Sequence, residues 1–186
     1  MDFTIYTTED APEGSKEFLK GVKEDFGFIP NLLGEFAESP AALEGYLTLN
    51  GIVEKTGFTP VEQQLAILAV SVENKCHYCS AIHSAILKNQ LGADAELVEA
   101  VRNQTELPDP KLNELVNYVR TVVQKRAFVE DAEIEGFLNA GYSKGNLLDV
   151  NVIIALKTIS NYTNHIADTP LDEPFREEQI EFAAKV

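Results

Sequence analysis

The chain has 186 residues, of which 45% are hydrophobic, so it is long enough and apolar enough to bury a core. Its 30 acidic residues outnumber its 15 basic residues, and the formal net charge of -15 argues against binding to nucleic acid or to an anionic membrane surface. No apolar run reaches the length of about 18 residues that a membrane span needs, and the acidic segment at the N-terminus is unlike a signal peptide, so we expect a cytoplasmic protein.

Helices are predicted along the first half of the chain. Segment 15–26 (SKEFLKGVKEDF) repeats apolar residues at helical spacing, and Pro40 is typical of the first residue of a helix. Thr59 and Pro60 are typical of a helix cap and first turn. The apolar run 61–72 (VEQQLAILAVSV) is too long for a single buried strand, so it is predicted to be a core helix.

The second half of the chain also contains residues that are typical of helix ends and connectors. Gly92 and Gly141 lie where helices are expected to stop, and segment 107–110 (LPDP) is predicted to be a connector. An amphipathic helix is predicted at 111–125 and a second core helix at 147–161. No Pro-rich or Ser-rich linker divides the sequence, so we predict a single all-α domain of eight or nine helices that spans the whole chain, residues 1–186.

A faint internal repeat relates the two core helices. At an offset of 84 residues, Gly57 corresponds to Gly141, and the two cysteines correspond to Ser160 and Thr163. The repeat favours a helical bundle built from two duplicated halves, of which only the first carries sulfur.

The segment 76–83 (CHYCSAIH) contains both cysteines of the chain and two of its three histidines. If it is helical, Cys76, Cys79 and His83 share one face and His77 points elsewhere. Asn74 is a good helix cap, so we predict a helix break there, with the cysteines in the first turns of a new helix.

That position favours thiol chemistry. The positive end of a helix and a nearby imidazole both stabilise a thiolate, which is the reactive form of cysteine. The helix dipole alone would give the lower pKa to Cys76, which is nearer the helix start. Such a dithiol can reduce a peroxide in two steps, in which one sulfur becomes a sulfenic acid and the other condenses with it to a disulfide, while His83 moves protons.

Other interpretations of the cluster remain open. The two sulfurs and His83 could hold a structural zinc ion with His165 as a fourth ligand, although no second pair of ligands is present. The cluster would then be a metal clasp, or a redox sensor, in a helical oligomer without enzymatic activity. A third possibility is an enzyme that decarboxylates or isomerises a lactone or another small cyclic acid, with His83 or His165 as the base.

The residues around the cysteines resemble the alkylhydroperoxidase AhpD-like family of the carboxymuconolactone decarboxylase superfamily, in its peroxidase-related branch. The resemblance runs from Thr59 to His83, with further similar segments at 28–33, 39–40 and 161–167. It implies an all-helical fold, assembly into homotrimers or homohexamers, and reduction of a hydroperoxide without a bound cofactor. An external dithiol, carried by a lipoyl or thioredoxin-type protein, would regenerate the enzyme.

The resemblance also implies roles for individual residues. Cys79 would attack the peroxide, Cys76 would form the disulfide with it, and His83 would belong to a proton relay. Typical members have a glutamate in that relay at the position of Gln64, which cannot take up a proton as a carboxylate can. We therefore expect another acid, Glu73 or less directly Glu62, to take its place.

Overall fold

The computed structural model describes residues 3–182, and these residues form α-helices, one π-helix and one 3-10 helix but no strand, which confirms the all-α prediction. Within this range no helix is sufficiently long and apolar to traverse a membrane. The elements are α1 (Glu13–Phe26), α2 (Asn31–Phe36), α3 (Pro40–Val53), α4 (Pro60–Glu73), α5 (His77–Ala85), the π-helix η1 (Ile86–Gln90), α6 (Ala95–Arg102), α7 (Pro110–Lys125), α8 (Asp131–Asn139), α9 (Lys144–Ala167) and the 3-10 helix η2 (Glu173–Glu178).

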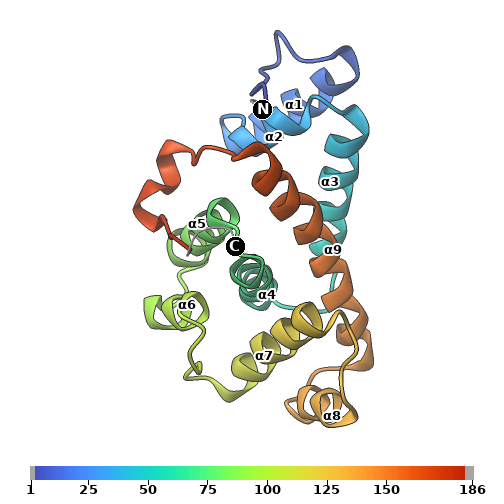
Figure 1. The fold of residues 1–186 in the computed structure, drawn as a ribbon, viewed down its shortest axis with the longest axis vertical. Coiled ribbons are helices and arrows are strands. Elements are labelled where there is room, and N and C mark those ends of the chain that lie inside the picture. Colours follow the sequence, from blue (N-terminus) through green and yellow to red (C-terminus); the bar gives the residue numbers. More distant parts are fainter. Residues whose placement is uncertain (1–2, 183–186) are drawn as a thin grey trace.

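Helix α4 is the centre of the fold. Figure 1 shows it nearly end-on, with α5, α6, α7 and α9 around it. Every residue from Leu65 to Val72 is buried, which explains why this run is apolar on all sides rather than on one stripe. The prediction of a core helix here is therefore confirmed.

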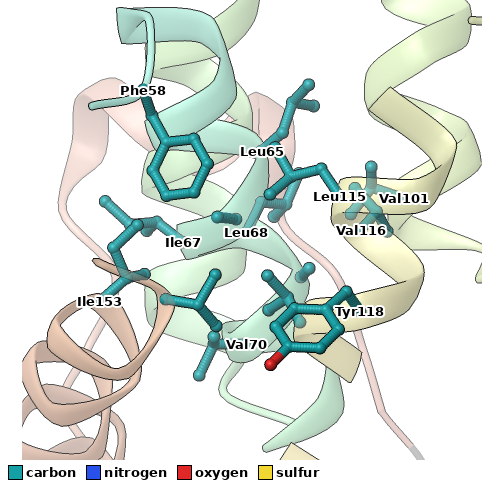
Figure 2. Close-up of a cluster of buried hydrophobic side chains, with 14 of the residues drawn as sticks. Phe58, Leu65, Ile67, Leu68, Val70, Val101, Leu115, Val116, Tyr118 and Ile153 are labelled. Atoms are coloured by element: carbon teal, nitrogen blue, oxygen red, sulfur yellow. The ribbon is translucent and has the colours of Figure 1, made fainter. Parts of the chain in front are cut away.

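Two apolar clusters fill the interior. The larger one joins α4 to α6, α7 and α9, and Figure 2 shows Leu65 and Leu68 of α4 beside Leu115 and Val116 of α7. The smaller cluster joins α1, α2 and α3 to the start of α5. Both cysteines belong to this smaller cluster, so their sulfur atoms lie in an apolar environment.

The predicted helix starts agree with the structure. Thr59 caps α4, and its hydroxyl and the Glu62 carboxylate form a reciprocal capping box. Ser143 caps α9 in the same way with Asn146, so the two core helices begin alike. However, α9 continues without a break through residues 160–163, whereas the corresponding segment 76–79 begins a new helix. The duplication of two halves stays a hypothesis.

Some boundaries differ from the predicted ones. Gly92 and Gly141 follow helix ends with φ of 63° and 99°, as expected, but Pro110 belongs to α7 rather than to the connector before it. Pro110 is the first residue of α7, where its missing N–H costs nothing, and Asp109 caps the helix. The helix predicted to start after Asn74 begins at His77, because Asn74 ends α4 instead of capping α5.

Candidate active site

A tight turn between α4 and α5 places the two cysteines. The N–H of Cys76 donates to the carbonyl of Ser71, and the N–H of Lys75 donates to the carbonyl of Val72, both over 2.9 Å. This pair of bonds is a Schellman motif, in which Lys75 adopts a left-handed conformation with φ of 55°. The turn makes Cys76 the N-cap of α5, directly after the end of the central helix.

The two sulfurs lie one helical turn apart and face α9. Cys76 is completely buried and Cys79 is 2% exposed. The amide Nδ2 of Asn164 on α9 donates to both sulfurs, over 3.4 Å to Cys76 and 3.2 Å to Cys79. The structure thus brings together the two cysteines that the sequence singled out, and one asparagine bridges them.

A buried lysine supplies the charge of the site. Lys157 of α9 is completely buried, and its Nζ lies 3.4 Å from the sulfur of Cys79. Burial by itself would raise the pKa of Cys79, but the hydrogen bond from Cys76 and the positive charge of Lys157 outweigh it and lower that pKa to about 5. The Ser160 hydroxyl, 3.7 Å from Cys79, acts in the same direction.

The pKa of Cys76 is shifted in the opposite direction to that of Cys79. Its hydrogen bond to Cys79 and its burial both raise its pKa, so it is the thiol that donates to the Cys79 thiolate. This assignment reverses the expectation from the helix dipole alone. Cys79 is still in the first turn of α5 and feels the dipole, and it also has the ammonium group of Lys157 in contact.

His83 lies beyond the lysine and is neutral. Its Nε2 accepts from the Nζ of Lys157 over 3.0 Å, so the proton is on Nδ1, which donates to Oε1 of Gln64 over 2.8 Å. Burial and the charge of Lys157 lower the pKa of His83 well below its ordinary value. Gln64 is partly exposed, so the chain of contacts runs from the protein surface to the buried thiolate.

The two glutamates expected to replace the family acid lie elsewhere. Glu62 accepts from Lys111 over 2.9 Å and from the hydroxyl of Tyr142 over 3.0 Å, and it caps α4. Glu73 accepts from Gln124 of α7 over 3.0 Å and faces Arg120 at 3.8 Å. Both carboxylates are therefore engaged on the α7 and α8 side of α4, and the structure does not bring either of them to His83.

Lys157 and Asn164 were not recognised from the sequence. A signal was present, because Lys157 is the single charged residue between Val150 and Ala167. Together with Ser160 and Asn164 it continues the buried stripe of α9 that begins at Val150 and Ile153. Polar residues that follow an apolar stripe at helical spacing indicate a polar site at one end of a core helix.

The contacts of Tyr78 hold the start of α5 in place. Its hydroxyl donates to Oδ2 of Asp172 over 2.6 Å and accepts from the backbone N–H of Leu32 over 3.3 Å. Asp172 also accepts from the N–H of Asn31. These bonds connect α5 to α2 and to the segment before η2, so the turn that carries the cysteines is fixed from both sides.

The zinc interpretation finds no ligand set. Among residues 3–182, no three or more His, Cys, Asp or Glu side chains are grouped so that they could hold a metal ion. His165, which would have been the fourth ligand, stacks on Tyr162 instead. His77, which was expected to lie off the face of the sulfurs, lines a cavity together with Asn74 and Asn164.

Comparison with known proteins supports the resemblance to the carboxymuconolactone decarboxylase superfamily. Residues 40–109 match the model of the carboxymuconolactone decarboxylase family. Comparison with curated protein sequences gives no match.

Solved structures share the fold over most of the chain. A peroxidase-related protein with an alkylhydroperoxidase AhpD core, from Ralstonia eutropha JMP134, is 20% identical with a TM-score of 0.83 over 93% of each chain. A peroxidase-related protein from Silicibacter sp. TM1040 is 18% identical, with a TM-score of 0.79 over 94% of this chain and 92% of that one. A variant of the debrominase Bmp8 in complex with 2,3,4-tribromopyrrole is 18% identical, with a TM-score of 0.76 over 94% of each chain. The resemblance to the superfamily is thereby confirmed, and at these identities the structures show a common fold.

Proposed function

We propose that this protein is a thiol-dependent peroxidase that reduces hydroperoxides with Cys79 and Cys76. The proposal starts from two findings: residues 40–109 match the carboxymuconolactone decarboxylase family, and the chain has an AhpD-like fold. The observation that supports this proposal most strongly is the buried pair of charges formed by the Cys79 sulfur and the Lys157 ammonium group, 3.4 Å apart. A thiolate is the form of cysteine that attacks peroxide, and a pKa of about 5 keeps Cys79 in that form at neutral pH.

In the first step the Cys79 thiolate attacks the terminal oxygen of the hydroperoxide and the O–O bond breaks. Sulfur is oxidised to a sulfenic acid, and the peroxide is reduced to an alkoxide. The alkoxide takes a proton from the ammonium group of Lys157 and leaves as an alcohol. Lys157 therefore has two roles, because it stabilises the nucleophile before the reaction and protonates the leaving group during it.

In the second step Cys76 attacks the sulfur of the Cys79 sulfenic acid. A disulfide forms, and the Cys76 proton and the sulfenic hydroxyl leave as water. An external dithiol, of the lipoyl or thioredoxin type, then reduces the disulfide by exchange and is itself oxidised. His83, whose Nε2 contacts Lys157, is the group that returns a proton to Lys157, and the hydrogen bond to Gln64 holds the imidazole in position.

The alternative reactions have less support. A base for decarboxylation or isomerisation needs a free nitrogen, but Nε2 of His83 accepts from Lys157, and burial together with the charge of Lys157 lowers the pKa of His83. A redox sensor without turnover would use the same two sulfurs, and it is distinguished from an enzyme only by kinetics.

The proposal is tested by peroxide consumption with dithiothreitol as the reductant. The unmodified protein is expected to turn over and, without reductant, to lose the mass of two hydrogen atoms. Cys79→Ser is expected to abolish consumption, and Cys76→Ser treated with peroxide without dithiothreitol is expected to stop after one oxidation and to leave a sulfenic acid that dimedone traps. Thr163→Ser, on α9 but bonded to the backbone of its own helix, serves as the control. Undiminished turnover in both cysteine variants would refute the proposal.

A further inference from the structure

Cys79 has two neighbouring groups that can act as nucleophiles once it is oxidised. One is the thiol of Cys76, which forms the disulfide in the second step of the proposed reaction. The other is Nζ of Lys157, which lies 3.4 Å from the sulfur of Cys79. Reacting atoms in productive geometries are typically about 3 to 3.5 Å apart, so this nitrogen is within reach of the sulfur without a movement of the backbone.

Lys157 becomes a nucleophile in the course of the reaction. An ammonium group has no free electron pair, but in the proposed first step Lys157 gives a proton to the leaving alkoxide and becomes an amine. Its side chain is completely buried, and its Nζ contacts the Cys79 sulfur and the neutral His83 but, within residues 3–182, no carboxylate. A buried ammonium group without a counter-ion is costly, so the amine is the favoured form until the thiolate is restored.

The other contacts of the site favour attack by this amine. Nε2 of His83 lies 3.0 Å from Nζ, so it is placed to accept the proton that the nitrogen loses as it bonds to sulfur. The hydroxyl of Ser160 and Nδ2 of Asn164 lie 3.7 Å and 3.2 Å from the sulfur of Cys79. These donors are close enough to bond to the oxygen of a sulfenic acid, which is the leaving group. Cys79 is only 2% exposed, so internal nucleophiles have an advantage over external ones.

We infer that Cys79 and Lys157 form a reversible sulfur–nitrogen bond, a sulfenamide, after Cys79 has been oxidised. Nζ attacks the sulfur of the sulfenic acid, the S–N bond forms and the S–O bond breaks, and the hydroxyl group leaves with one proton of the amine as water. Sulfur is neither oxidised nor reduced in this step, which therefore needs no further oxidant. An external dithiol reopens the bond by attack on sulfur, which returns the amine and leaves a mixed disulfide, and the second thiol of the reductant then releases Cys79.

The sulfenamide is an alternative to the disulfide and protects the same sulfur. The inference rests on the proposed peroxidase function, because it needs the sulfenic acid, and it adds a modification site to that function. A sulfenic acid that persists can be oxidised further to a sulfinic acid, which thiols do not reduce. Capture by Lys157 removes the sulfenic acid whenever Cys76 has not reacted with it.

The intact mass of Cys76→Ser protein tests the inference, because this variant cannot form the disulfide. After treatment with hydrogen peroxide and without dithiothreitol, we expect the loss of the mass of two hydrogen atoms. Peptide mapping is expected to join the peptide that contains Cys79 to the one that contains Lys157, and dithiothreitol is expected to restore the starting mass. Dimedone is omitted here, because it would compete with Lys157 for the sulfenic acid.

Two lysine variants in the Cys76→Ser background complete the test. Lys157→Arg keeps a positive charge beside the thiolate, but a guanidinium group stays protonated and does not attack sulfur, so this protein is expected to gain one or two oxygen atoms instead. Lys88→Met, which removes a lysine paired with Glu99 and Glu178, is expected to lose two hydrogen atoms like its parent.

Three results are decisive against the inference. A lasting gain of oxygen in Cys76→Ser, or a mass loss that survives Lys157→Arg, would overturn it while turnover by the unmodified protein upheld the peroxidase. A peptide map of Cys76→Ser that joins Cys79 to any other group would overturn it without the help of a lysine variant. No reaction of the unmodified protein with peroxide would overturn both the inference and the proposed function.

Discussion

Lys157 shows how a single buried charge can decide the chemistry of a site. An ammonium group that is fully removed from water must have a compensating partner, and its nearest sulfur is that of Cys79. Burial would lower the pKa of Lys157, but the charge of the Cys79 thiolate raises it above the ordinary value. Each of the two groups therefore keeps the other ionised.

Removal of this charge should raise the pKa of Cys79. In the unmodified protein the ultraviolet absorbance of the thiolate should be present at neutral pH and should disappear as the pH falls through about 5. In Lys157→Met the midpoint should move up to about 8.5 or above, the ordinary value of a cysteine. Because the folded pKa is depressed, the stability that the thiolate adds is present above about pH 8.5 and is lost as the pH falls to 5.

Lys88→Met is the matched control for this titration. Lys88 is a partly buried lysine that pairs with Glu99 and Glu178 instead of with a sulfur. Its removal should leave the thiolate midpoint near pH 5. An unchanged midpoint in Lys157→Met would show that the lysine does not stabilise the thiolate.

The sequence predicted the juxtaposition of the two cysteines better than their surroundings. The spacing of Cys76, Cys79 and His83 on one helical face was sufficient to place them together. Gln64 was recognised as a departure from the family, but the search for a substitute looked for another acid. The structure instead places a cation beside the thiolate, and a charge that comes from a helix about 80 residues away along the chain cannot be seen in local spacing.

Helix α5 depends on contacts that tie its first turn to distant segments. The buried hydroxyl of Tyr78 bonds Asp172 and the backbone of Leu32, so one side chain joins α5 to α2 and to the chain before η2. Burial and the neighbouring Asp172 raise the pKa of Tyr78, which keeps the phenol protonated and able to donate.

Tyr78→Phe should therefore lower the free energy of unfolding by about 1 to 3 kcal/mol, because it leaves the buried N–H of Leu32 without its acceptor and removes the shorter of the two bonds to Oδ2 of Asp172. Urea unfolding followed by circular dichroism measures this difference. Tyr6→Phe removes a comparable bond, from Tyr6 to Glu38, at an exposed site and should have an effect below about 1 kcal/mol. An equal decrease in the free energy of unfolding in Tyr78→Phe and Tyr6→Phe would contradict the role assigned to Tyr78.

Element boundaries were the less predictable part of the fold. Hydrophobic runs predicted α4 and α9 correctly because a long apolar run leaves a strong signal: α4 is buried on all sides, whereas α9 has a buried stripe and further apolar residues on its outer face. Asn74 was misplaced because asparagine is suited to either end of a helix, and the Schellman turn that follows it uses Lys75 where glycine is usual. The π-helix η1 after α5 has no comparable signal in the sequence.

The outer face of α9 bears on the assembly of the whole molecule. Apolar or small residues recur along it in alternating steps of four and three, and several are well exposed: Leu148 is 68%, Tyr162 55% and Ile166 71% exposed. In a chain with so many acids, the exposed part of this helix after Asp149 carries no acidic residue. We propose that this face contacts a second copy of the chain in a homo-oligomer, for which the resemblance suggests a trimer or hexamer. The repeating residues are Leu148, Val152, Ala155, Ile159, Tyr162 and Ile166.

A charge in this face should dissociate the oligomer. Ile159→Glu is expected to reduce the mass found by sedimentation to that of one chain, because a buried carboxylate on each copy would lack a partner. The control is Phe128→Glu, which changes an apolar side chain that is 84% exposed away from α9 and should leave the mass unchanged. A monomeric unmodified protein would contradict the expected assembly.

The contact between Lys157 and Cys79 also affects the oxidation–reduction equilibrium. When the two sulfurs join, the negative charge disappears, and the neighbouring amine must give up its proton or stay charged without a counter-ion in an apolar interior. The dithiol state is thus favoured electrostatically, which shifts the standard potential of the couple toward more positive values, as it does in strongly oxidising thiol–disulfide proteins. An oxidised molecule of this kind accepts electrons readily, so its recovery does not require an unusually strong electron donor.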